Sequence, residues 1–166
     1  MKTIVDRYHP ALREHAKEVE KSLFGTRKLS KILKDMREAL KNEDDGVALA
    51  ASQLGVALRI FVVSPRAYSK NDTSHPLTFI NPRIIKRSKR EQLVDEGCLS
   101  IRWLYGEVKR STNATVEAYN EKGQRFTRGA GGVLAQIFQH EVDHLDGILF
   151  TDKARNVRDI PPTPVA

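Results

Sequence analysis

Two histidines four positions apart, with a glutamate after the first, constrain this chain more than any other feature. They are His140 and His144, in the sequence His-Glu-Val-Asp-His. On an α-helix these positions share one face, so both imidazoles can reach a single metal ion. The carboxylate of Glu141 would then lie where it can take a proton from water at that metal. Histidines four apart also occur by chance, so two ordinary helix histidines are the alternative for this motif alone.

A catalytic metal site of this kind needs a third protein ligand and an open position for water. One protease class would have a third histidine where Phe150 stands, and another would need a downstream glutamate, which this chain lacks after Glu141. Cys98 is the best candidate, because Gly97 beside it lets backbone and substrate approach closely. A lone cysteine is otherwise most often an inert packing residue. The other candidates are His9, His15, His75, Asp146, Asp152 and Asp159.

The composition fits one globular domain: 166 residues, 40% hydrophobic and 30% charged, with a net charge of +7. No apolar stretch is long enough for a bilayer and the N-terminus lacks the apolar core of a secretory signal, so we expect a cytoplasmic protein without membrane contact. The single cysteine excludes an intramolecular disulfide. The basic residues are scattered and do not alternate with aromatic residues, so we expect a solvated basic surface and no direct DNA binding.

The spacing of apolar residues predicts a helix over roughly residues 26–42 and a second from Val133 to Leu145, which carries the histidines. Strands are expected at residues 59–63, 77–80, 84–86, 91–94, 99–103, 114–119 and 125–127, with the glycine cluster 129–132 interrupting the sheet pattern. The predicted class is α+β, with strand-rich middle segments around one long C-terminal helix. We expect one domain over residues 1–155 and a disordered tail over 156–166.

Three segments together resemble the three signature motifs of the peptide deformylases, in the same order and at similar separations. They are residues 46–53 (Gly-Val-Ala-Leu-Ala-Ala-Ser-Gln), 96–100 (Glu-Gly-Cys-Leu-Ser) and 139–144 (Gln-His-Glu-Val-Asp-His). The segment 8–13 and Arg110 also fall where the family has matching residues. The resemblance spans roughly residues 4–150, and it implies antiparallel sheets packed around the histidine-bearing helix.

The resemblance implies a metallohydrolase that removes the formyl group from formyl-methionyl nascent polypeptides and releases formate. Cys98, His140 and His144 would hold one divalent ion, Fe²⁺ in the cell, with Zn²⁺, Ni²⁺ or Co²⁺ able to substitute. Glu141 would carry the proton, while the Gln53 side-chain amide and the Leu99 backbone N–H would stabilise the oxyanion.

The same resemblance implies where the substrate binds. Its backbone would lie along the segments of Val47 and Gly97 like an added strand. The methionine pocket would be lined by Val47, Val94, Val133 and Ile137. Glu96 and Arg110 are expected to pair and to brace the strand that carries the cysteine. A monomer that works near the ribosome is expected, although the tail lacks the long basic helix that some bacterial members use for ribosome docking.

Four residues depart from the family pattern: Ala48, Arg102, Lys109 and Gln136. The Cβ of Ala48, where a second glycine is usual, would crowd the substrate strand. None of the four removes a ligand or the proton carrier, so we expect activity with an altered substrate preference.

Two other hypotheses fit the same ligands. A metallopeptidase or amidohydrolase would act on another acyl group, which turnover of formyl-Met-Ala against acetyl-Met-Ala would reveal. A metal-binding module with a ribosomal partner and lost activity would bind metal without releasing formate.

Overall fold

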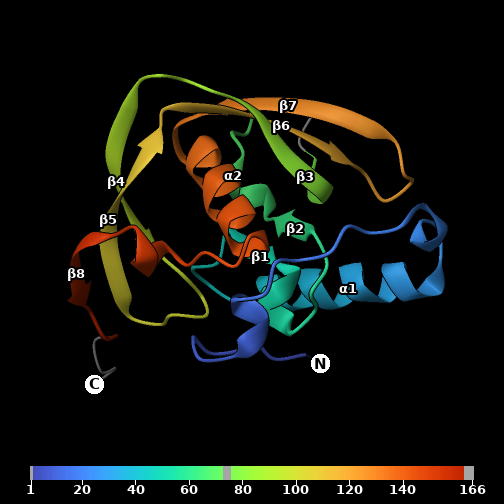
Figure 1. Ribbon diagram of the computed structural model, residues 1–166, viewed down its shortest axis with the longest axis horizontal. Coiled ribbons are helices and arrows are strands. Elements are labelled where there is room, and N and C mark those ends of the chain that lie inside the picture. The colour runs from blue at the N-terminus through green and yellow to red at the C-terminus, as the bar shows by residue number, and fades with distance from the viewer. Residues whose placement is uncertain (1, 73–75, 163–166) are drawn as a thin grey trace.

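Two antiparallel sheets lie on either side of one buried helix (Figure 1). The computed structural model describes residues 2–72 and 76–162. The helices are α1 (Arg27–Lys41) and α2 (Gly132–Leu145), and the strands are β1 (Ala48–Ala50), β2 (Ile60–Val63), β3 (Thr78–Arg87), β4 (Glu91–Gly97), β5 (Leu104–Ser111), β6 (Asn113–Tyr119), β7 (Arg125–Gly131) and β8 (Arg155–Asp159). One sheet has the order β1-β2-β3-β6-β7 and the other β4-β5-β8. The predicted α+β class is confirmed.

The helix α1 begins and ends close to the predicted bounds. The Thr26 hydroxyl accepts a hydrogen bond from Leu29 N and caps its first turn. Its apolar face is buried against β1 and β2, around Leu33 and Met36. The opposite face is polar, which explains why the spacing of apolar residues was enough to predict this helix.

The helix α2 is mostly buried and packs against the larger sheet. Phe138 packs against the stacked rings of Phe61 and Phe79, with centroid distances of 6.3 and 5.2 Å. The helix begins at Gly132, whose φ of +57° is easily adopted only by glycine. Since the sheet holds one face of α2, the other face is directed toward β4 and β5.

Three predictions of local structure were wrong. Residues 99–103 form a turn instead of a strand, closed by a hydrogen bond from Ile101 N to Cys98 O, because Ile101 turns inward to the core. Residues 104–111, where no strand was expected, form β5. The glycine cluster does not end the sheet at residue 129, since β7 continues to Gly131 opposite Asn113. A strand is held by backbone hydrogen bonds, so small side chains do not exclude it.

The expected disordered tail over residues 156–166 was also wrong in part. Residues 156–159 belong to β8, which pairs with β5 in antiparallel register. Every side chain of β8 is exposed, so apolar spacing gave no signal for it. Residues 160–162 have no regular structure, and residues 163–166 lie outside the described part of the chain.

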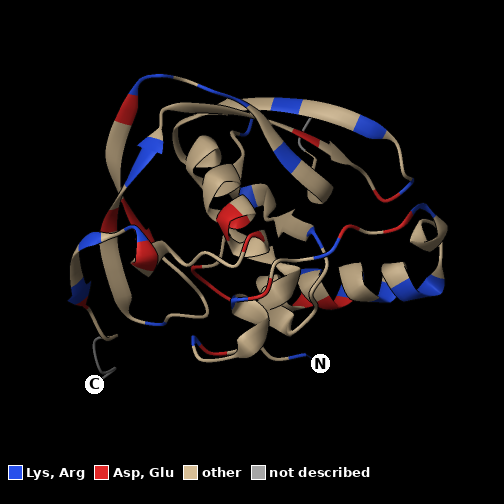
Figure 2. Cartoon of the chain, viewed as in Figure 1, with Lys and Arg blue, Asp and Glu red and all other residues tan. Residues whose placement is uncertain are grey.

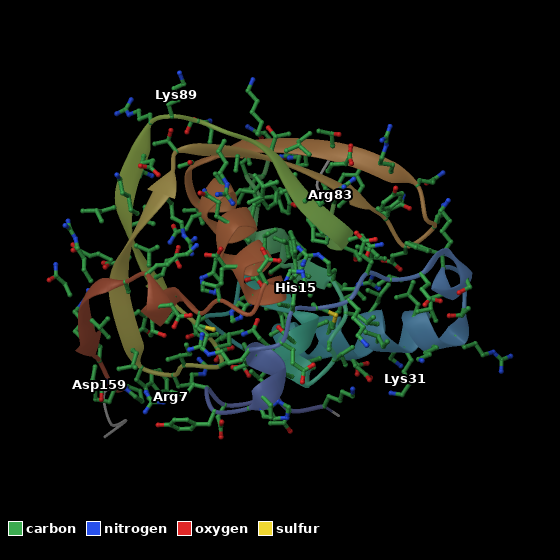
Figure 3. The ribbon with its side chains drawn as sticks, viewed as in Figure 1. Arg7, His15, Lys31, Arg83, Lys89 and Asp159 are labelled. Atoms are coloured by element: carbon green, nitrogen blue, oxygen red, sulfur yellow. The ribbon has the colours of Figure 1, made fainter. Side chains whose placement is uncertain are left out.

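Lysine and arginine are spread over α1, β3, β7 and β8 without forming one face (Figure 2). The labelled residues Lys31, Arg83 and Lys89 belong to α1, to β3 and to the turn between β3 and β4 (Figure 3).

Candidate active site

The three predicted metal ligands lie together between β4 and α2. The ligand atoms of Cys98, His140 and His144 are all within 4.8 Å of one another. No other group of three such side chains is found within residues 2–72 and 76–162. Cys98 follows the last residue of β4, and its Sγ lies 3.2 Å from His144 Nε2. One turn of α2 separates the two histidines, as the spacing requires.

The other candidate ligands lie elsewhere. His9 caps a short 3-10 helix by accepting a hydrogen bond from Ala11 N at 3.2 Å. His15 is largely exposed, near Asp146 (Figure 3). Asp152 pairs with Arg13. Asp159 lies in β8, and His75 lies outside the described residues.

The electrostatics of the cluster suit a cation. Burial by itself raises the pKa of the Cys98 thiol, but His144 and His140 lower that pKa to about 5, so the sulfur is a thiolate at neutral pH. One cysteine sulfur with two histidine nitrogens is a ligand set typical of Zn²⁺ and other transition metals. The residues present therefore fit a divalent metal.

Glu141 is buried beside these ligands and faces the cavity. Its Oε2 has no hydrogen-bond partner among the described residues, and burial raises the pKa of the carboxyl. A buried oxygen without a partner is rare and calls for a water molecule or substrate group. A raised pKa is the property that a proton carrier near neutral pH needs.

Gln53 faces the ligands from the opposite side, in the 3-10 helix η3 (Ala51–Leu54). Its Oε1 accepts a hydrogen bond from Ala50 N at 2.9 Å, which orients the amide nitrogen toward Cys98 Sγ at 3.5 Å and Ser100 Oγ at 3.2 Å. The backbone N–H of Leu99 makes no hydrogen bond within the described chain. Gln53 and Leu99, the two predicted oxyanion donors, both line the cavity beside the ligands.

A cavity of about 350 Å³ opens beside the cluster. Of the predicted substrate-binding residues, Val47, Gly97, Val133 and Ile137 line it. Val94 does not; it shares a face of β4 with Glu96 but lies further along the strand from Cys98. A Cβ on Gly97 would lie 2.8 Å from the ring of Tyr105, so any other residue would force this ring to move.

The four departures from the family pattern occupy different places. Ala48 and Gln136 line the cavity, and the Gln136 amide is held by Asp95 O at 2.8 Å. Lys109 pairs with Glu91 on the surface. Arg102 crosses the cavity mouth to Asp45 and Glu43, which precede β1.

Sequence reasoning missed Trp103, which also lines the cavity. Its φ of +68° is unusual for a bulky residue, and the guanidinium of Arg102 lies 5.5 Å from the ring centroid. Its backbone O accepts a hydrogen bond from Ile160 N at 2.8 Å. No sequence signal marks such a conformation in a tryptophan.

The predicted pairing of Glu96 with Arg110 is present, and it belongs to a larger buried network. Arg110 donates to Glu96 at 2.6 and 2.9 Å, and His140 Nδ1 lies 2.9 Å from Glu96 Oε2. Burial alone raises the pKa of Glu96, but hydrogen bonds from Arg110 and His140 lower it to about 2. Asp143 also pairs with Arg110, which the sequence did not predict.

Comparison with known proteins assigns the chain. The family model described as Polypeptide deformylase matches residues 1–159. Peptide deformylase 2 of Clostridium acetobutylicum is 43% identical over 125 residues, which cover 75% of this chain and 78% of that protein. Within the described residues, no helix has the length and apolar character needed to cross a membrane.

Solved structures agree over nearly the whole chain. The crystal structure of peptide deformylase from Thermotoga maritima has a TM-score of 0.81 at 34% identity, covering 93% of this chain and 98% of that one. An actinonin-bound crystal structure of a class I type b peptide deformylase from Acinetobacter baumannii has a TM-score of 0.82 at 30% identity, with coverages of 92% and 97%.

Proposed function

The chain belongs to the polypeptide deformylase family, and we propose which of its residues carry out the removal of the formyl group from formyl-methionyl polypeptides. The observation that carries this proposal is the convergence of Cys98, His140 and His144 within 4.8 Å, with the buried carboxylate of Glu141 beside them. Family membership also decides between the hydrolase classes that the histidine motif alone left open.

We propose that these three side chains hold one divalent metal. When bound, the metal supplies a Lewis acid that polarises a carbonyl oxygen and makes water more acidic. Glu141 accepts a proton from the water that attacks the formyl carbon. It then donates this proton to the amine nitrogen as the C–N bond breaks, so that formate and a free N-terminal amine are the products.

Gln53 and Leu99 stabilise the negative charge that develops on the formyl oxygen. The Gln53 amide is already oriented by Ala50 N, so little reorganisation accompanies the reaction. The Leu99 N–H has no acceptor within the described residues, which leaves it available for this oxygen.

The cavity beside the ligands accepts the methionine side chain. Val47, Val133 and Ile137 provide apolar surface, and the substrate backbone lies between the segments of Val47 and Gly97. Val133 is 62% exposed, as expected for a residue that a ligand covers.

We further propose Fe²⁺ as the metal in the cell, a monomer of one catalytic domain, a cytoplasmic location and work near the ribosome. Metal analysis of protein purified without oxygen tests the first of these. Zn²⁺, Ni²⁺ or Co²⁺ would be accepted by the same thiolate and imidazoles.

The test is formate release from formyl-Met-Ala-Ser by wild type, Glu141→Gln and Cys98→Ser, with metal content measured on each. We expect Glu141→Gln to keep its metal and to lose activity by about 10²- to 10⁴-fold, because proton transfer is removed. Cys98→Ser should be depleted of metal. Full activity in either variant would contradict the proposal.

A further inference from the structure

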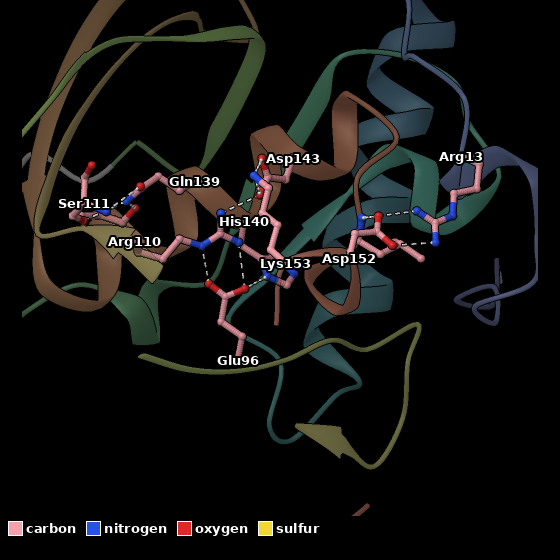
Figure 4. A network of polar contacts seen from close by, with 11 residues as sticks. Arg13, Glu96, Arg110, Ser111, Gln139, His140, Asp143, Asp152 and Lys153 are labelled. Carbon is pink, nitrogen blue, oxygen red and sulfur yellow. Dashed lines mark hydrogen bonds and ion pairs between the residues drawn. The ribbon is translucent and has the colours of Figure 1, made fainter. Parts of the chain in front are cut away.

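A chain of four charged side chains leads from a metal ligand to the protein surface (Figure 4). Glu96 contacts His140 at 2.9 Å, and Arg110 donates to Glu96 from Nε and Nη2. The remaining nitrogen of Arg110, Nη1, donates to Asp143 at 2.6 Å. Lys153 Nζ then lies 2.9 Å from both carboxylate oxygens of Asp143. The chemistry proposed above uses neither Asp143 nor Lys153.

The two carboxylates of this chain face two permanently charged cations, Arg110 and Lys153, and His140 also contacts Glu96. Glu96 and Asp143 are two anions, and Arg110 supplies one cation. Their side chains are only 2%, 9% and 4% exposed, so a charge without a partner would be costly. Lys153 provides the second cation from a position that is 42% exposed, where its own charge is partly solvated.

Lys153 also has a specific role toward Asp143. Within the described residues it is the only partner of Asp143 Oδ1, while Oδ2 is shared with Arg110. Without Lys153, Asp143 would have a single cation. Arg110 would then be drawn toward Asp143, which weakens its two bonds to Glu96 and frees the imidazole of His140 to rotate.

The turn before Lys153 is itself fixed against the metal cluster. This 3-10 helix, η5 (Phe150–Asp152), places the ring of Phe150 beside His140, with centroids 6.4 Å apart and planes 24° apart. Asp152 accepts hydrogen bonds from Arg13 and from Leu149 N. The η5 turn therefore places Phe150 beside the His140 ring, and Lys153, the residue after the turn, reaches Asp143.

We propose that Lys153 is a positioning residue for the metal centre: by neutralising Asp143 it keeps Arg110 on Glu96 and holds His140 in its ligating orientation. This inference rests on the proposed metal ligands. Residues that orient metal-bound histidines commonly change metal affinity or activity by about 10- to 100-fold when they are replaced.

The experiment measures Co²⁺ affinity by competition with a chelator, together with the melting temperature of the metal-free protein. Lys109→Met is the matched control, because Lys109 also pairs with a carboxylate at 2.9 Å but lies outside the network. We expect Lys153→Met to bind Co²⁺ about 10-fold or more weakly. Lys153→Arg should be close to wild type, and Lys109→Met unchanged.

Equal Co²⁺ affinity in Lys153→Met and Lys109→Met would overturn the inference, even if Lys153→Met melts at a lower temperature. If Lys153→Met does not fold, Lys153→Gln, which keeps a donor without the charge, is measured against the same control and by the same criterion. Failure of the proposed function looks different: Cys98→Ser would then bind Co²⁺ as tightly as wild type.

Discussion

Two groups of ion pairs lie beside the cavity, one buried and the other partly exposed to water. On the metal-bearing wall, formed by β4, β5 and α2, Arg110 of β5 meets Glu96 and Asp143, with all three side chains less than a tenth exposed. At the cavity rim, formed by residues 43–45 and 102–103, Arg102 meets Glu43 and Asp45, with side chains 32%, 28% and 57% exposed. Water weakens the rim pairs but not the buried ones. The ligand geometry is thus fixed firmly, while the cavity mouth is held loosely.

Replacement of Arg110 is the strongest test of this difference between the buried and the exposed ion pairs. Arg110→Met removes the shared partner of two buried carboxylates, so we expect the free energy of unfolding to fall by about 3–5 kcal/mol. Urea denaturation of the metal-loaded protein measures this fall. A loss no greater than that of Arg102→Met would mean that burial does not distinguish the two walls.

Gln53 provides a second test, because it is only 2% exposed although it reaches the ligand Cys98 from η3, outside the metal-bearing wall. Gln53→Ala removes one oxyanion donor, and we expect kcat to fall by about 10²- to 10³-fold with metal content unchanged. Steady-state formate release and metal analysis test this. If the variant bound less metal but kept its turnover per bound metal ion, Gln53 would instead serve to position the metal ligands.

The smallest effect is expected at the rim. Arg102→Met should change the free energy of unfolding by less than about 1 kcal/mol, as is usual for exposed pairs. It should raise the KM for formyl-Met-Ala-Ser at low salt, because the cavity mouth is no longer bridged. Near 1 M salt, where charges are screened beyond about 3 Å, wild type and variant should converge. A difference that persists at high salt would argue against an electrostatic bridge.

The sequence predicted the metal-bearing wall better than the rim, for a physical reason. Helical spacing fixes how His140 and His144 lie relative to one another, and the motif around Cys98 resembles a known family. The pairing of Glu96 with Arg110 followed from the same resemblance. Lys153 and Asp143 escaped prediction because nothing local indicates that they meet across η5.

The rim and the tail depended on long-range contacts. Apolar residues at 99–103 favoured a strand, but the chain turns there and Trp103 adopts a positive φ. The exposed strand β8 has no apolar face, and it forms because β5 offers a free edge. Val94 was expected in the cavity from matching positions alone, without knowledge of how far along β4 the cavity extends.

The most direct measurement is the absorption spectrum of the Co²⁺-substituted protein compared with Cys98→Ala. One thiolate and two imidazoles around a single ion predict an intense sulfur-to-metal band in wild type, which should vanish in the variant while weaker binding through the histidines persists. A wild-type spectrum without that band, or an unchanged spectrum in Cys98→Ala, would contradict the assignment of Cys98 as a ligand.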